Sequence, residues 1–486
     1  MRGVQAGFQT LDQEVVIDDL EVRGELPPWL SGALVRNGPA KFEDDHRSFR
    51  HWFDGQAMLH RFGFADGVVS YRNRYLETPS FKAVRDEGRI AFGEFATDPC
   101  RSLFARFFTH PRLRTTPNTN VNVVSDGERD WALTETPIAV EFDRDTLATV
   151  GVSDHDDGIT GHVTTAHPHR APLTGDLVNY VLKFGRRSVY RIYRQRGRDR
   201  RLLASLSTDR PGYLHSFAVT ERHVVLAIFP YVVNPLGLLF RGKPFIENYR
   251  WRPELGTRFV VFDQRDGSVV ADARTDAFFG FHHINAFDAD GRVVVDICAY
   301  PDAGVVDALY LDGVRGGGDL PPAFPTRYEV DLAGGGVRSR RLAEDAFELP
   351  RIAYNTHNGR EYRYAYGVGA RDNGTRDFLN QLVKLDVRSG RTSYWREPGK
   401  YPGEPVFVPS PDARAEDDGV LLSVVLDADA GRSGLLVLDA ATFEEVARAE
   451  VPHAIPFGFH GQFTSPRLAA RPASGQPSNP ANTPGS

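Results

Sequence analysis

The chain is poor in the features that mark several large classes of protein. Among its 486 residues are two cysteines, Cys100 and Cys298, too few for a disulfide framework, so a cytosolic protein is expected. The net charge of −6 offers no basic excess, and nucleic acid is therefore not an expected partner. The first residues, MRGVQAGFQTLDQEVV, lack the apolar core of a secretory signal. With 41% hydrophobic residues, the composition is that of an ordinary globular protein.

Long apolar runs are also lacking. None reaches the roughly 18 uninterrupted residues of a membrane-spanning helix. The closest, VVLAIFPYVVNPLGLLF at residues 224–240, is broken by prolines and a glycine. It predicts either a buried strand and a loop, or a strand followed by an apolar patch that enters one membrane leaflet. Alternating Phe and Arg residues within 101–114 form a second candidate patch.

Strand signals, by contrast, are abundant. Short runs rich in Val, Ile, Phe and Tyr alternate with turns of Gly, Asp and Asn. One pattern, a strand ending in an acid followed by a turn and another strand, recurs every 50 to 70 residues. Its copies centre on Asp143, Asp263, Asp331, Asp386 and Asp439, with a looser copy at Tyr193. Six copies and an N-terminal stretch predict an all-β, seven-bladed β-propeller, whereas a large sandwich, the alternative, needs no repeat.

Four of the 15 histidines stand in well-separated apolar stretches. They are His167 in TTAHPH, His215 in YLHSF, His282 in FGFHHIN and His460 in IPFGFHGQF. A buried imidazole needs partners for its ring nitrogens, and neutral imidazole is the commonest protein ligand of transition metals. The spacings of 48, 67 and 178 residues correspond to about one, one and three blades. We therefore expect the four to meet around an iron ion on the propeller axis.

Neighbouring histidines leave some choices open. His282 and His283 point to opposite faces of a strand, so only one of them reaches the axis. His167 and His169 share a face, and the residues alone do not choose between them. His60, in DGQAMLHRF, is expected at the surface. The alternative for the whole chain is a metal-free propeller that serves as a binding module.

Eight segments in one order carry a family resemblance that runs from about Leu26 to Phe463. They are GELPPWLSGALVRNGP, HWFDGQAMLHRF, TETP, TAHPH, HSFAVT, FHHIN, EDDGVLLSVV and GFHGQF. Together they resemble the carotenoid cleavage oxygenases, a family of iron enzymes. The resemblance implies a seven-bladed propeller, capped by loops, with Fe(II) on its axis. We expect one domain over residues 1–468 and, from its Pro, Ser and Gly content, a disordered tail over 469–486.

The resemblance also assigns roles to residues. The ligands of one Fe(II) per chain would be His167, His215, His282 and His460. Behind them would stand Glu135 for His215, Glu348 for His282 and Glu404 for His460. A carboxylate in that place fixes the tautomer of a ligating imidazole and raises its basicity. No catalytic residue beyond the metal centre is expected, and Val121 matches a family position near the iron.

The implied reaction is cleavage of a conjugated double bond of a carotenoid or apocarotenoid by O2 to give aldehydes. Likeness to the animal branch favours central cleavage at the 15,15′ bond, which yields retinal. The alternatives are cleavage of apocarotenals at another bond, stilbene cleavage and retinyl-ester isomerohydrolysis. Thr134 stands where the stilbene enzymes carry Lys, which counts against a stilbene. An insoluble polyene substrate favours a cytoplasmic enzyme that docks peripherally on membranes through residues 98–108 and 234–240, with an oligomeric state that the sequence leaves open.

Overall fold

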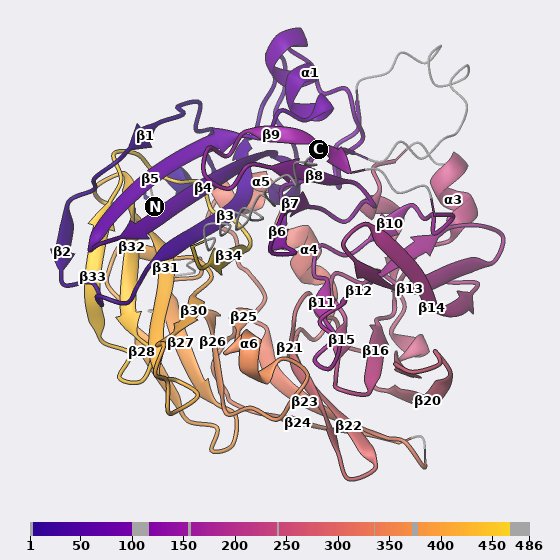
Figure 1. Cartoon of the computed structure of the whole chain (residues 1–486). Helices are drawn as coiled ribbons and strands as arrows, with labels where there is room; N and C mark the ends of the chain where they lie inside the picture. The colour runs from indigo at the N-terminus through magenta and orange to yellow at the C-terminus, as the bar shows by residue number, and fades with distance from the viewer. Residues whose placement is uncertain are drawn as a thin grey trace, which may run out of the picture.

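The computed structural model describes residues 3–99, 116–153, 157–240, 243–334, 336–371 and 378–466. Seven antiparallel sheets surround a central axis, and the predicted seven-bladed β-propeller is confirmed (Figure 1). The expected tail at 469–486 and the candidate patch at 101–114 lie outside the described residues. Within the described ranges, no helix is both long enough and apolar enough to cross a bilayer.

Five blades are each built from a single stretch of the chain, and in the third a separate pair of strands, β17 (Tyr231–Val232) and β18 (Arg250–Trp251), interrupts the order. The first is β6 (Asn122–Ser125), β7 (Asp130–Leu133), β8 (Ala139–Phe142) and β9 (Thr149–Ser153). The second is β10 (Val163–Thr164) and β11 (His169–Arg170), β12 (Leu177–Lys183), β13 (Ser188–Arg196) and β14 (Asp199–Thr208). The third is β15 (Ala218–Val219), β16 (His223–Ile228), β19 (Thr257–Asp263) and β20 (Val269–Thr275). The fourth is β21 (His283–Ala289), β22 (Arg292–Ala299), β23 (Phe324–Asp331) and β24 (Val337–Arg341), and the fifth β25 (Glu348–Arg351), β26 (Tyr364–Gly369), β27 (Gln381–Asp386) and β28 (Thr392–Trp395).

The two remaining blades join the ends of the chain and close the ring. The sixth contains β29 (Lys400–Pro402), β30 (Val406–Pro409), β31 (Gly419–Asp427), β32 (Arg432–Asp439) and β33 (Glu445–Glu450), and the early strand β2 (Val22–Gly24) pairs with β33. The seventh contains β1 (Val16–Ile17), β5 (Val68–Tyr75), β4 (Gln56–Ala65) and β3 (Gly32–Lys41), and the late strand β34 (Gly461–Thr464) completes it beside β3. Because each of these blades takes strands from both ends, the ring opens only if both pairings break.

The acidic repeat marks the turn between the two outer strands of a blade. At Asp143, Asp331, Asp386 and Asp439 the carboxylate accepts hydrogen bonds from backbone N–H groups two and three residues on, and at Asp263 from the N–H two residues on. These contacts stabilise the turn locally, which is why the same residue type recurs there. Tyr193 differs, because it lies within β13 at a register shift against β14 rather than at a turn.

Short helices and loops cover one end of the ring and connect strands elsewhere. The helices are η1 (Val4–Phe8), η2 (Trp52–Asp54), α1 (Pro79–Glu87), α3 (Pro235–Phe240), η3 (Ile246–Asn248), η4 (Pro253–Leu255), α4 (Gly304–Ala308), α5 (Leu311–Arg315) and α6 (Tyr354–His357). The apolar run at residues 224–240 contains β16, then β17 (Tyr231–Val232), which pairs with β18 (Arg250–Trp251), and then α3. The strand expected there is confirmed, and a short helix replaces the expected loop.

Candidate metal centre

The innermost strands bring four histidines together on the axis. His215, His282 and His460 lie just before β15, β21 and β34, and His167 lies between β10 and β11. One ring nitrogen of each falls within 4.8 Å of the others. Four strands that start at the same end of the ring thus place one imidazole each at its centre, as the spacing predicts.

Glutamates from the three other blades stand behind the cluster. Glu135 follows β7, Glu348 opens β25, and Glu404 lies between β29 and β30. Their carboxylates accept hydrogen bonds from the Nδ1–H groups of His215 at 2.7 Å, His282 at 2.5 Å and His460 at 2.8 Å. All seven blades therefore contribute one residue, a histidine or a glutamate, to the centre.

These contacts fix the tautomers of the rings and place two nitrogen lone pairs close together, an arrangement that a cation stabilises. Because the carboxylates of Glu348 and Glu404 accept hydrogen bonds from the Nδ1–H groups of His282 and His460, a ring with a single proton carries its lone pair on Nε2. The two Nε2 atoms lie 3.1 Å apart, with no proton between them to share. Such a pair is unfavourable unless a positive ion lies between the nitrogens, so the donor set fits a divalent transition metal.

Electrostatics favours the neutral imidazole at His167 and His460 and the charged carboxylate at Glu404. Burial, together with the three neighbouring rings, holds the pKa of His167 well below its usual value. Burial also lowers the pKa of His460, to about 4, although Glu404 opposes this shift. For Glu404 burial favours the protonated acid, yet Arg351, His460 and Arg36 together lower its pKa to about 2. The site is thus ready to bind a cation at neutral pH without first losing protons.

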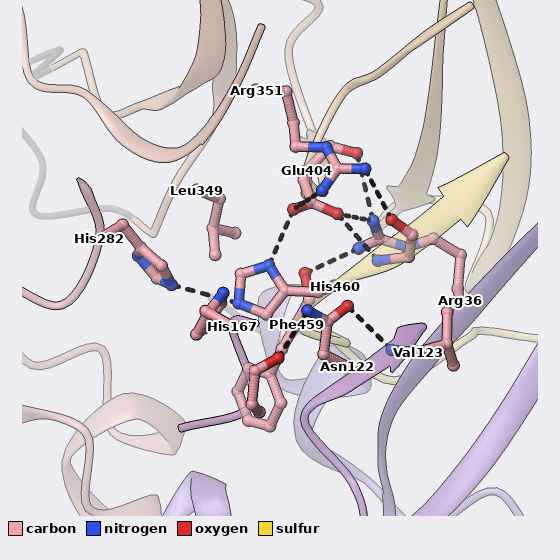
Figure 2. A network of polar contacts seen from close by, with 12 residues as sticks. Arg36, Asn122, Val123, His167, His282, Leu349, Arg351, Glu404, Phe459 and His460 are labelled. Carbon is pink, nitrogen blue, oxygen red and sulfur yellow. Dashed lines mark hydrogen bonds and ion pairs between the residues drawn. The ribbon is translucent and has the colours of Figure 1, made fainter. Parts of the chain in front are cut away.

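The hydrogen-bond partners of the three carboxylates differ. Glu404 lies beside Arg36 of β3, whose guanidinium contacts its Oε2 at 2.5 Å and the carbonyl oxygen of Phe459 at 3.0 Å (Figure 2). Arg351 lies 3.8 Å from the same carboxylate. In contrast, tyrosine hydroxyls donate to the other two, Tyr213 to Glu135 at 2.7 Å and Tyr300 to Glu348 at 3.0 Å.

A cavity of about 430 Å³ opens onto the histidines from the loop-covered end. Around the cluster its walls include the rings of Phe53, Phe281 and Phe459, and Val121 and Leu349 also line it. Leu349 has a φ of 47°, and its N–H donates to Glu348 at 2.6 Å. A left-handed leucine is rare and costs energy, so the surrounding structure holds this segment in place next to the candidate ligands.

Known proteins share this architecture over nearly the whole chain. The model of the family described as retinal pigment epithelial membrane protein matches residues 8–465. The mitochondrial carotenoid-cleaving dioxygenase of Mustela putorius furo is 34% identical, over 94% of this chain and 95% of that protein. The chain belongs to the carotenoid cleavage oxygenase family. It is therefore an enzyme of the carotenoid dioxygenase class.

Other members of the carotenoid cleavage oxygenase family agree with this placement. The β,β-carotene 15,15′-dioxygenase of Gallus gallus is 31% identical, over 91% of this chain and 94% of that protein. The crystal structure of cobalt-substituted apocarotenoid oxygenase from Synechocystis superposes with a TM-score of 0.85 at 28% identity, covering 96% of this chain and 98% of that one. That a family member of this fold binds cobalt agrees with a metal site in this fold.

The histidines that neighbour the cluster residues in sequence bond to other groups. His169 contacts the carbonyl oxygen of Phe217 through Nε2 at 2.9 Å, and His283 contacts the hydroxyl of Ser216 through Nδ1 at 2.7 Å. The expectation that His60 lies at the surface is wrong. It is 4% exposed and contacts the hydroxyl of Tyr71 at 2.9 Å, because the pairing of β4 with β3 and β5 buries this face of the strand.

Sequence reasoning missed the residues that hold the three glutamates. Tyr213 lies two positions before His215 in YLHSF, so alternation along an extended chain was a signal for its proximity. Arg36 in LVRNGP and Tyr300 in CAYP carry no comparable signal, because strands distant in sequence bring them to Glu404 and Glu348.

Proposed function

We propose that this protein is an Fe(II) dioxygenase that cleaves a conjugated double bond of a carotenoid or apocarotenoid with O2, and that central cleavage yields retinal. The ligands would be His167, His215, His282 and His460, holding one iron per chain. The observation that carries the proposal is the convergence of four neutral imidazoles, three of them backed by carboxylates, at an apolar cavity. Retinal as the product is supported by the name of the Gallus gallus relative.

The four histidines would hold Fe(II), which would supply the activation of O2. The residues of the chain position the substrate and exclude water. Phe53, Phe281 and Phe459 provide an apolar surface on which a rigid polyene lies beside the metal. The glutamates hold the Nδ1 protons, so the imidazole rings keep their orientation throughout turnover.

Product analysis tests this function. Iron-loaded protein is mixed with all-trans β-carotene in detergent micelles under air, and the products are separated by chromatography. Retinal as the sole product is the expected result. Shorter apocarotenals as products would keep the dioxygenase function and place the cleaved bond elsewhere. An iron-loaded protein that leaves both β-carotene and apocarotenals intact would overturn the proposal, whether or not it cleaves stilbenes.

Peripheral docking on membranes is part of the proposal, because the substrate is insoluble in water. Among the described residues, α3 supports it, since Leu236 is 54% exposed while Leu238 packs against the core. We expect Leu236→Asp to weaken co-sedimentation with anionic liposomes several-fold without changing iron content. Val150→Asp, at a similarly exposed position of β9 (63% exposed), is the matched control. Equal binding of the wild type and both variants would contradict docking through α3.

A further inference from the structure

The cavity walls carry more polar side chains than a hydrocarbon substrate requires. One set of lining residues is apolar and includes Leu320, Phe347 and Leu379. A second set, here called the polar wall, consists of Glu94, Thr116, Thr136 and His162. Three of its members are connected, because Thr136 donates to the carbonyl oxygen of Thr116 at 2.8 Å, and the side chain of Thr116 bonds to Glu94.

Glu94 is the most unusual member of the polar wall. It is 4% exposed, and the Ser80 hydroxyl donates to its Oε1 at 2.8 Å. Burial raises the pKa of Glu94 to about 8, with the charge of Asp54 acting in the same direction, so the acid is protonated at neutral pH. A buried carboxylic acid that keeps its proton is a hydrogen-bond donor. Ser80, Thr116 and Gln56 are the side chains that contact Glu94 from the protein, and the cavity lies on its remaining side.

His162 adds a second donor. The backbone N–H of Phe184 donates to its Nδ1 at 3.0 Å, and its ring stacks on the Phe184 ring at 5.7 Å. Burial lowers the pKa of His162, so the ring is neutral and its one proton resides on Nε2. The polar wall therefore presents a carboxylic O–H and an imidazole N–H to the same cavity.

We infer that the polar wall is a subsite for an oxygen atom at one end of the polyene, a carbonyl or a hydroxyl, with Glu94 as its main donor. This inference rests on the proposed function and deepens it by naming the substrate class. A hydrocarbon end group would displace water from Glu94 and leave its proton unpaired, which is unfavourable. An oxygenated end group replaces the lost hydrogen bond. The preferred substrate is thus a polyene oxygenated at one end, and an apocarotenal with a β-ionone ring at the other end still gives retinal by central cleavage.

The chain contains its own probe for this binding. Trp52 lines the cavity, so a bound polyene, which absorbs at the wavelengths of tryptophan emission, quenches its fluorescence. Dissociation constants for an apocarotenal and for all-trans β-carotene are measured by this quenching in one detergent, without any need for turnover.

Glu94→Leu and Glu94→Gln, each loaded with iron, are the test variants. In Glu94→Leu the apocarotenal is expected to lose about tenfold in affinity relative to β-carotene, the size of one hydrogen bond. Glu94→Gln keeps an N–H donor and should retain most of the preference. Leu320→Gln, which adds an amide to the apolar set, is the control that should not reproduce the preference.

The results distinguish a failure of the polar-wall subsite from a failure of the dioxygenase function. Equal losses for both polyenes in Glu94→Leu, or no loss for either, would overturn the subsite, because a structural acid does not distinguish end groups. Discrimination in binding without turnover of any polyene would keep the subsite and reject the dioxygenase function.

Discussion

Two regions of this protein bury a glutamate, and they leave it in different protonation states. Glu404, behind His460, is 1% exposed and ionised, because Arg36 and Arg351 lower its pKa to about 2. Glu94, in the cavity wall, is 4% exposed and protonated, because burial raises its pKa to about 8 and hydroxyl groups are its partners. The neighbours of a buried acid, rather than its burial, thus decide whether it serves as a charge or as a donor.

The three carboxylates behind the histidines also differ in their neighbours. Arg36 offsets the charge of Glu404, whereas Glu135 and Glu348 have hydroxyl donors from Tyr213 and Tyr300. The two tyrosine-bound carboxylates are therefore the ones placed to balance a divalent ion that the histidines would hold. The arginine-bound one lies where the chain ends meet, with Arg36 on β3 and His460 next to β34, so it joins the metal centre to the closure of the ring.

The largest expected effect comes from breaking the ion pair of Glu404. Arg36→Met leaves a buried charge without its partner and should lower the free energy of unfolding by about 3–5 kcal/mol, measured by denaturant titration. Arg292→Met is the control, because the side chains of its ion pair with Glu329 are 35% and 27% exposed, and it should cost about 1 kcal/mol or less. Similar losses in the free energy of unfolding in the two variants would show that burial does not make the Arg36–Glu404 pair more important than an exposed pair.

Glu348→Gln tests whether a tyrosine-bound carboxylate supports metal binding. Losing the carboxylate behind His282 should weaken Fe(II) binding about 10- to 100-fold, measured anaerobically by competition with a chelator. Glu329→Gln, on β23 and paired with Arg292, is a control expected to bind iron like the wild type. An unchanged affinity in Glu348→Gln would show that this carboxylate does not support the metal.

A smaller effect should appear in the pH dependence of stability. Because folding raises the pKa of Glu94, the folded protein binds this proton more tightly than the unfolded chain. The resulting stability is complete below the ordinary glutamate pKa and is lost as the pH rises towards 8. Asp54, the acid that faces Glu94, titrates near pH 6 and contributes in the same direction.

Between pH 6.5 and 8, the wild-type free energy of unfolding should therefore fall by up to about 1.4 kcal/mol per pH unit. Glu94→Gln should flatten most of that slope, as determined by urea unfolding at several pH values. Parallel curves for the two proteins would mean that Glu94 is ionised at neutral pH.

Much of this architecture could be predicted because it is local or periodic. The turn-capping aspartates recur in five of the seven blades, and the spacing of the apolar histidines follows the blade period. What could not be predicted depends on contacts between distant strands. Arg36 and Glu404 are 368 residues apart, and the burial of His60 follows from its strand neighbours rather than from its flanking Arg61. The proton on Glu94 likewise depends on a cavity that only the folded chain forms.

The central claim is that four histidines form the metal centre. Its most direct test is to measure bound iron in two variants whose substituted histidines lie two residues apart. His167 and His169 lie two residues apart, but only His167 lies in the cluster, while His169 bonds to the Phe217 carbonyl oxygen. Purified apoprotein is titrated with Fe(II) under anaerobic conditions and the bound metal is measured. One iron per chain in the wild type and His169→Ala, with tight binding lost in His167→Ala, is the predicted result. Iron retained by His167→Ala, or lost equally from both variants, would contradict the four-histidine centre.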